Sequence, residues 1–223
     1  MDNELVTPRP QLVIFDLDGT PTDPARGIVS SFRYALDQVG VAVPDDPDLA
    51  GRVVGPPMHH TLRAMGLGEL TDDAIAAYRA EYTAGGWVLN EVFDEIPELL
   101  ADLRAAGVRL AVTTSKADPT ARQILAHFGL DGHFEVIADA SLDGGRSTKA
   151  DVVAHALNQL HPVPEHVLMV GDRVHDVHGA SHHGIDTVVV DWGYGGRDLE
   201  DPANDGAVTH VPTVAALREV LGV

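Results

Sequence analysis

A short apolar run that ends in two aspartates constrains this chain more than any other feature. Residues 12–15 (LVIF) are too few for a helix and predict a buried strand, after which Asp16 and Asp18 follow directly. Both carboxylates can then lie in the crevice above the sheet, where two anions repel each other unless a cation or a shared proton offsets the repulsion. Gly19 completes the turn because it tolerates backbone angles that other residues resist. A solvated Asp-Gly turn is the plain alternative, but such a turn requires neither the strand nor the second acid.

Helical and strand patterns alternate along the chain from Val92 onward. Predicted strands cover 108–114, 134–137, 166–171 and 187–190, and predicted helices cover 96–106, 119–128, 149–160, 174–183 and a last segment from about 212. This alternation predicts an α/β fold with a doubly wound, Rossmann-like parallel sheet, whose ligands bind at the carboxyl ends of the strands.

The stretch from Pro21 to Leu89 lacks strand patterns and predicts a small all-helical module inserted after the first strand. Asp23 and Pro24 form a helix start, and apolar residues at helical spacing follow until Gly40. We therefore expect two domains, an α/β core made of 1–20 and 90–223 and a helical insertion made of 21–89.

Polar side chains recur at the carboxyl ends of the predicted strands. The second strand ends in residues 113–116 (TTSK), and Asp172 and Asp176 follow the fourth strand. Lys149, one of two lysines in the chain, opens a predicted helix, where a cation opposes the helix dipole by about 0.3 to 1 kcal/mol. A lysine at that position needs an anion nearby. Acids, hydroxyls and an ammonium are thus predicted to share one crevice.

Composition narrows the possible partners. The formal net charge is −19, which disfavours binding of nucleic acid and of anionic membranes. A phosphorylated metabolite would also be repelled, so its binding site must supply positive charge of its own. The chain has no cysteine, which excludes disulfides and thiolate chemistry. The first residues lack a signal-peptide pattern, and no apolar run approaches membrane-spanning length. We expect a cytoplasmic monomer or homodimer.

At this point four motifs match a known family in order and spacing. They are residues 16–20 (DLDGT), the hydroxyl after the apolar run 110–112, Lys149, and the segment from Gly171-Asp172 to Asp176. From residue 11 to its end, the chain resembles the haloacid-dehalogenase-like phosphatases. The helical insertion is similar to the small cap domain of the phosphoglycolate-phosphatase and phosphoglucomutase branch.

The resemblance implies a mechanism and a cofactor. Asp16 would attack the phosphorus of a monoester to give an aspartyl-phosphate, and Asp18 would act as general acid and then general base. Mg²⁺ would be held by the Asp16 carboxylate, the Asp18 backbone carbonyl and Asp172, with Asp176 holding a bound water or a ligand. The implied function is hydrolysis of a small phosphorylated metabolite, as in a phosphoglycolate phosphatase.

The residues predicted to bind the substrate match the family's motifs less closely than the catalytic residues do. The residues expected to contact substrate are Gly19, Arg52, Thr114, Ser115 and Lys149. Residues 113–115 are consecutive hydroxyls, and the apolar run before them favours Thr114 as the phosphate ligand. Arg52, in the segment 51–57 that is similar to a substrate-facing loop, could grip a carboxylate or second phosphate. His59 and His60 near that loop, and Lys116 beside the hydroxyls, have no assigned role.

Several alternatives stay open beside this interpretation. Pro21 stands where the family usually has a bulky aliphatic residue, so the turn after the nucleophile could differ. A 5'-nucleotidase-like or phosphoglucomutase-like activity is possible, as is a non-catalytic member that binds a phosphorylated ligand or a protein. A dehalogenase needs neither Asp18 nor Asp172, and a phosphonate hydrolase needs a lysine that residues 21–90 do not contain.

Overall fold

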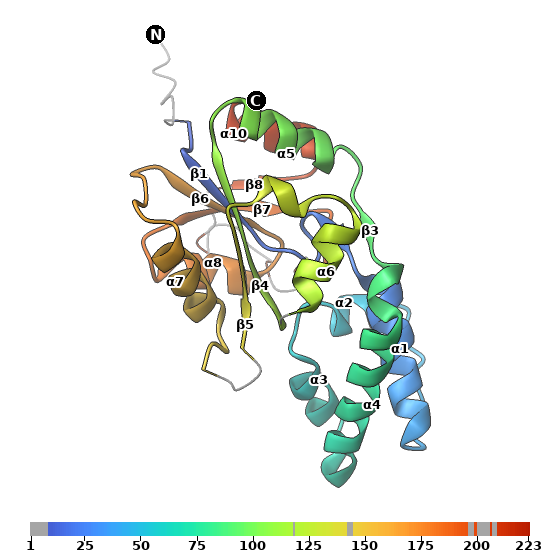
Figure 1. Cartoon of the computed structure of the whole chain (residues 1–223). Coiled ribbons are helices and arrows are strands. Elements are labelled where there is room, and N and C mark those ends of the chain that lie inside the picture. The colour runs from blue at the N-terminus through green and yellow to red at the C-terminus, as the bar shows by residue number, and fades with distance from the viewer. Residues whose placement is uncertain (1–8, 118, 142–144, 196–198, 200–205, 207–208) are drawn as a thin grey trace.

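A computed structural model describes residues 9–117, 119–141, 145–195, 199, 206 and 209–223. Its centre is a six-stranded parallel sheet in the order β5-β4-β1-β6-β7-β8 (Figure 1). The strands are β1 (Leu12–Phe15), β4 (Arg109–Ala117), β5 (Val136–Ala140), β6 (Val167–Gly171), β7 (Asp186–Val190) and β8 (Thr209–Val211). The predicted α/β fold with a parallel sheet is therefore confirmed.

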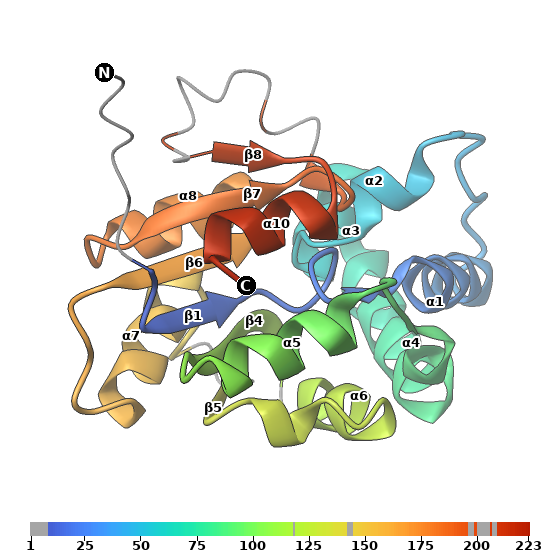
Figure 2. The same ribbon diagram turned by 90° about the horizontal axis from the view of Figure 1, so that it is seen from above.

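Helices cover both faces of the sheet (Figure 2). One face carries α5 (Ile96–Ala105), α6 (Thr120–His127) and α10 (Val214–Leu221), and the other carries α7 (Lys149–Gln159) and α8 (Val174–Ser181). Strand β1 is buried on both sides because its side chains alternate. Val13 and Phe15 pack in the cluster with α5 and α10, whereas Leu12 and Ile14 pack in the cluster with α7 and α8.

The helical insertion has an apolar core of its own, which includes Phe32, Leu62 and Tyr82. Its elements are α1 (Ala25–Gln38), α2 (Leu49–Val53), α3 (Met58–Ala64), η1 (Gly68–Leu70), α4 (Thr71–Ala84) and η2 (Gly86–Leu89). The chain enters and leaves it through a two-stranded antiparallel pair, β2 (Thr22–Asp23) and β3 (Glu91–Val92). In Figure 1 the insertion lies beyond the carboxyl ends of β1 and β4, so it faces the edge where a ligand binds.

Three sequence-based expectations about elements are wrong in detail. The expected loop over 51–57 begins inside a helix, because α2 extends to Val53. The strand expected to be the last, 187–190, is followed by β8, which pairs in parallel with β7. The strand expected at 134–137 begins two residues later, at Val136. The boundaries of the two domains remain a prediction. Among the described residues, no helix is long and apolar enough to cross a membrane.

Candidate active site

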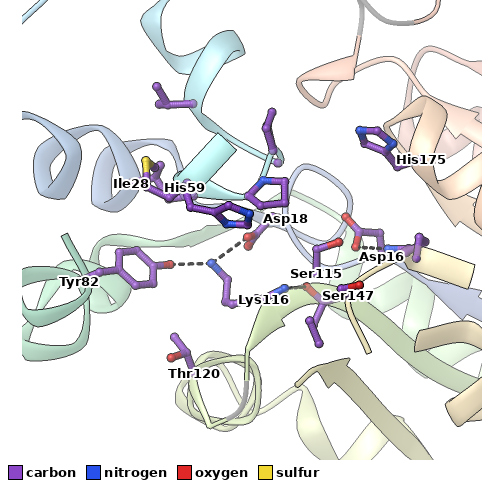
Figure 3. A pocket seen from close by; sticks show the side chains of 18 of the residues that line it. Asp16, Asp18, Ile28, His59, Tyr82, Ser115, Lys116, Thr120, Ser147 and His175 are labelled. Atoms are coloured by element: carbon purple, nitrogen blue, oxygen red, sulfur yellow. Dashed lines mark hydrogen bonds and ion pairs between the residues drawn. The ribbon is translucent and has the colours of Figure 1, made fainter. Parts of the chain in front are cut away.

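The carboxyl ends of three adjacent strands meet at one pocket. Asp16 follows β1, Thr114 lies near the end of β4, and Asp176 lies on α8 just after β6. These residues line a cavity of about 500 Å³ between the sheet edge and the helical insertion (Figure 3). Lys149 reaches the same cavity from the first residue of α7, a helix whose start is fixed by a capping box between Thr148 and Asp151.

Lys149 is the cation that the acids of this site require. Its Nζ lies 2.5 Å from Asp16 Oδ1 and 2.7 Å from Asp176 Oδ1, and it donates to the Thr113 carbonyl oxygen at 2.8 Å. Burial alone would lower the pKa of Lys149, but Asp16 and Asp176 raise it above its ordinary value. The ammonium therefore stays charged, and its three protons all have acceptors.

Asp16 is buried at a position where its charge is costly. Burial raises its pKa from 3.8 to about 7, with Lys149 lowering it and Asp176 raising it further. Burial also raises the pKa of Asp172, and the charges of Asp176 and Asp16 raise it further. One lysine does not neutralise this group of acids, so the site has room for further positive charge.

A divalent cation fits the site by the chemistry of its donors. Asp16, Asp172 and Asp176 each offer a carboxylate oxygen, and these oxygens lie within 4.8 Å of one another. Asp172 Oδ2 accepts from the Tyr194 N–H at 2.7 Å, while the buried Oδ1 has no hydrogen-bond partner among the residues that the structure describes. An unsatisfied buried carboxylate oxygen beside a second carboxylate is the arrangement that a hard cation such as Mg²⁺ satisfies.

Glycines bring the backbone close to Asp172. Gly19 has a φ of +87°, and a Cβ there would collide with the Asp172 carboxylate. A Cβ at Gly193 would also collide with Asp172, and with the Gly19 carbonyl. The structure thus places Gly19 as a residue that makes space for Asp172.

Asp176 has a different environment from Asp172. Its Oδ1 is paired with Lys149, and its Oδ2 accepts from the Arg173 N–H at 3.0 Å. Both oxygens are therefore occupied by protein donors. This arrangement suits a residue that orients Lys149 and the start of α8 as well as one that contacts a metal through a bound water.

Asp18 pairs with Lys116, to which the sequence assigned no role. Figure 3 shows Lys116 between Asp18 and Tyr82: its Nζ lies 2.8 Å from Asp18 Oδ2 and donates to the Tyr82 hydroxyl at 2.9 Å. Burial alone would lower the pKa of Lys116, but Asp18 raises it above its ordinary value. Because Tyr82 belongs to α4, Lys116 joins the second aspartate of the motif to the helical insertion.

The three consecutive hydroxyls point in different directions. Thr113 is directed at the Met169 sulfur, 3.9 Å away, and does not line the pocket. Thr114 and Ser115 line it, and Thr114 Oγ1 accepts from the Lys116 N–H at 3.1 Å. The structure thus brings Thr114, Ser115 and Lys149 together as expected from the sequence.

Pro21 fits the turn that follows Asp18. The turn is closed by hydrogen bonds from the Gly19 N–H to the Thr22 carbonyl at 2.7 Å and from the Thr22 N–H to the Leu17 carbonyl at 3.2 Å. Neither bond uses the N–H that proline lacks. The Pro21 carbonyl accepts from Phe93 N–H at 3.1 Å, which ties the turn to the segment that leaves the helical insertion.

Arg52 lies elsewhere than expected. Its side chain is 61% exposed, its Nη1 is 2.9 Å from Asp46 Oδ2, and it is not among the residues that line the pocket. The α2 helix accounts for this difference, because in its last turn Val53 is buried while Arg52 is exposed and paired with Asp46. Of the two neighbouring histidines, His59 lines the pocket and His60 does not.

Sequence reasoning missed two residues that connect the core to the helical insertion. Arg173 Nη2 donates to the Gly51 carbonyl at 3.2 Å and to the Val54 carbonyl. Tyr194 donates its hydroxyl to Asp23 and packs against the apolar core of the insertion. For Arg173 the available signal was its position immediately after Asp172, since a residue next to a site aspartate must lie near the pocket. For Tyr194 it was the segment 192–195 (WGYG), which resembles phosphoglycolate-phosphatase-like members.

The chain is similar to known proteins along most of its length. A family model described as haloacid dehalogenase-like hydrolase matches residues 13–190. The chain is 66% identical over 214 residues to a protein of Mycobacterium tuberculosis H37Rv named tyrosine-protein kinase PtkA, covering 96% of this chain and 73% of that protein. It is 41% identical over 218 residues to a 5'-nucleotidase of Pseudomonas aeruginosa PAO1, covering 94% of each.

Other similarities point to phosphatases. A phosphoglycolate phosphatase of Aquifex aeolicus is 27% identical over 184 residues, which cover 82% of this chain and 86% of that protein. The crystal structure of a predicted phosphatase from Clostridium acetobutylicum is 36% identical and superimposes with a TM-score of 0.86, covering 96% of this chain and 100% of that one.

Proposed function

The chain belongs to the haloacid dehalogenase-like hydrolases, and from this premise we propose that it is a Mg²⁺-dependent phosphatase that forms an aspartyl-phosphate on Asp16. One observation carries the proposal: Lys149 fixes Asp16 beside Asp172, whose buried Oδ1 has no partner. A nucleophile, a cation and an unsatisfied carboxylate oxygen at one strand edge are what phosphoryl transfer needs.

The protein residues divide the reaction into two steps. In the first, an Asp16 carboxylate oxygen attacks phosphorus, and the bond to the leaving oxygen breaks as that oxygen takes a proton from Asp18 in its carboxylic acid form. Oδ1 of Asp18, which has no partner among the described residues, would carry this proton while Oδ2 stays with Lys116. In the second, water attacks the phosphorus of the aspartyl-phosphate and loses a proton to Asp18, which releases inorganic phosphate and regenerates Asp16. Lys116, the ion partner of the Asp18 carboxylate, holds that side chain at the pocket.

Charge neutralisation carries most of the catalysis in such a reaction. Lys149 would bind a nonbridging oxygen of the transferred group with a proton that it now donates to Asp16 or Asp176, and the Thr114 hydroxyl would bind another such oxygen. Asp16, Asp172 and the Asp18 backbone carbonyl would hold Mg²⁺, with Asp176 supporting the site from Lys149 and the α8 start. Bound there, Mg²⁺ supplies positive charge to the phosphoryl oxygens and to the nucleophile.

A direct test uses p-nitrophenyl phosphate with the purified protein. We expect phosphate release that requires Mg²⁺, stops with EDTA and returns when Mg²⁺ is restored in excess. Asp16→Asn removes the nucleophile and should abolish turnover, whereas Asp73→Asn, at an exposed acid on α4, should leave it unchanged. A hydroxylamine-labile phosphoprotein should form in the wild type and be missing from Asp16→Asn. Wild-type protein that releases no phosphate from a broad panel of phosphomonoesters with Mg²⁺ contradicts the proposal.

The substrate we favour is a small phosphorylated metabolite of the phosphoglycolate type. The Aquifex relative supports this choice, and the net charge of −19 argues against nucleic acid or an anionic membrane as partner. We also propose a cytoplasmic protein. A second candidate is a nucleoside monophosphate, because the Pseudomonas relative is named a 5'-nucleotidase and the cavity of about 500 Å³ extends well beyond one phosphoryl group. Comparison of kcat/KM for phosphoglycolate with kcat/KM for a nucleoside monophosphate separates the two candidates.

A further inference from the structure

The pocket has a second wall that the phosphoryl chemistry does not use. That wall belongs to the helical insertion and includes one face of α4, whose pocket-lining residues recur at helical spacing: Ile75, Tyr78, Arg79, Tyr82 and Thr83. Met58 and His59 of α3 adjoin it. A substrate whose phosphorus lies at Asp16 has its leaving group between the core and this wall. The wall therefore contacts the part of the substrate that distinguishes one phosphomonoester from another.

Most strong bases that line the pocket already have partners. Lys149 is paired with Asp16 and Asp176, Lys116 with Asp18, and Arg146 Nη2 lies 3.3 Å from Asp139 Oδ1; Arg173 donates to carbonyls of the helical insertion. Arg79 differs from them. Within the part of the chain that the structure describes, no hydrogen bond or ion pair engages its guanidinium, although the residue lines the pocket.

His59 lies beside Arg79 in a positive environment. Burial lowers the pKa of His59, and His60, Arg63 and Arg79 lower it further. The three neighbouring side chains that lower this pKa are thus all bases. Figure 3 shows the His59 ring turned into the pocket, on the side of Tyr82 and Lys116. None of the described residues of the insertion that line the pocket is acidic, so in a chain of net charge −19 the guanidinium of Arg79 is positioned to attract an anion into it.

We propose that Arg79, assisted by His59, binds a second anionic group on the leaving group of the substrate. This inference rests on the proposed phosphatase function and narrows its substrate class. The substrate is a phosphomonoester or a phosphoanhydride that also carries a carboxylate or a second phosphate, at a distance that spans from Asp16 to α4. A planar guanidinium binds either anion through two parallel hydrogen bonds, and the imidazole can donate a third.

Arg52 provides a matched comparison for Arg79. Both arginines lie on the helical insertion, but Arg52 is paired with Asp46 and does not line the pocket. The sequence favoured Arg52 for an anion because of its place in the segment 51–57. The structure favours Arg79 for that role, because Arg79, although exposed, lines the same cavity as Asp16.

The test compares substrates that differ only in the charge of the leaving group. Phosphoglycolate carries a carboxylate, 2-hydroxyethyl phosphate is its neutral counterpart, and phosphoethanolamine carries a positive charge. Pyrophosphate supplies the second phosphate, and adenosine monophosphate supplies a large leaving group without a second anion. We expect the wild type to prefer phosphoglycolate or pyrophosphate over 2-hydroxyethyl phosphate by at least tenfold in kcat/KM, with phosphoethanolamine the poorest. Whether phosphoglycolate or pyrophosphate is preferred then identifies the second anion as a carboxylate or a phosphate.

Arg79→Met should remove this preference. The loss of one charge-assisted interaction predicts a ten- to hundredfold lower kcat/KM for the anionic substrate, mainly through KM, because the contact is the same in the ground and transition states. Hydrolysis of 2-hydroxyethyl phosphate and p-nitrophenyl phosphate should change by less than twofold. Arg79→Lys should restore part of the preference, and Arg52→Met should change neither substrate.

Failure of this inference differs from failure of the proposed function. A wild type that hydrolyses p-nitrophenyl phosphate but favours adenosine monophosphate or 2-hydroxyethyl phosphate over both anionic substrates overturns the second-anion site and leaves the phosphatase intact. The second-anion site is also overturned if Arg79→Met lowers all substrates equally or if Arg52→Met reproduces its effect. A protein inactive on every phosphomonoester contradicts the proposed function itself.

Discussion

Removal of the metal should make folding stability depend on pH through Asp16. In the metal-free protein, burial raises the pKa of Asp16 from 3.8 to about 7, against the opposing effect of Lys149. The folded protein then binds a proton that the unfolded chain releases. The stability gained from that proton is complete below about pH 3.8 and is lost as the pH rises through about 7.

The size of this effect follows from the shift. Three pKa units correspond to at most about 4 kcal/mol, since each unit is worth about 1.4 kcal/mol. That is a large part of the roughly 5 to 15 kcal/mol that typically separates folded from unfolded protein. Asp172, whose pKa burial also raises, acts in the same direction. Mg²⁺ bound by the two ionised acids offsets their cost, so it should stabilise the protein more at pH 8 than at pH 5.

Thermal unfolding with EDTA or saturating Mg²⁺ measures this difference. For a chain of this size about 1 kcal/mol moves Tm by roughly 2 to 4 °C, so the Mg²⁺-induced rise at pH 8 should exceed that at pH 5 by up to about 10 °C. Asp16→Asn cannot titrate and should flatten the pH dependence of the metal-free protein, while Asp73→Asn should retain it. Equal Mg²⁺ increments at both pH values, or an unchanged slope in Asp16→Asn, would refute this reasoning.

Three further predictions concern residues that connect the site to its surroundings. Arg173→Met removes two bonds to carbonyls of the helical insertion and should raise KM several-fold while Mg²⁺ still stabilises the protein; an unchanged KM contradicts that link. Gly193→Ala places a Cβ against Asp172 and should lower the free energy of unfolding by about 1 to 3 kcal/mol. It should also reduce the Mg²⁺-induced rise in Tm, whereas a normal rise would show that the backbone at this residue adapts. Lys116→Met leaves Asp18 without its ion partner and should lower stability by about 3 to 5 kcal/mol in thermal or urea unfolding, and a loss below about 1 kcal/mol would mean that Asp18 finds another donor.

The sequence was informative about the sheet because buried parallel strands have a distinct pattern. Runs such as 12–15 and 166–171 are apolar almost throughout, as expected for strands covered on both faces. The site could be predicted for a related reason: parallel strands end at one edge, so the residues that follow them converge. Asp16, Thr114 and Asp172 could therefore be placed together from the order of strands and motifs alone.

Features that depend on long-range pairing could not be predicted. Strands β2 and β3 have two residues each, too few for a pattern, and they pair across the whole helical insertion. The choice between Arg52 and Arg79 depends on how that insertion is oriented over the sheet. Tyr194 reaches Asp172 with its backbone N–H and Asp23 with its hydroxyl, across 22 and 171 positions of the chain respectively. None of these relations leaves a local signal in the sequence.

The pairing of β2 with β3 has a consequence for how this protein could change over evolutionary time. Thr22 lies opposite Val92 in an antiparallel pair, so the chain leaves the core and returns to it at neighbouring points about 5 Å apart. The whole helical insertion between these points therefore begins and ends at nearly the same place on the core. Its length can change at a free-energy cost that grows only with the logarithm of that length. Selection can therefore replace the wall that chooses the substrate while the core keeps the residues that break the phosphate ester.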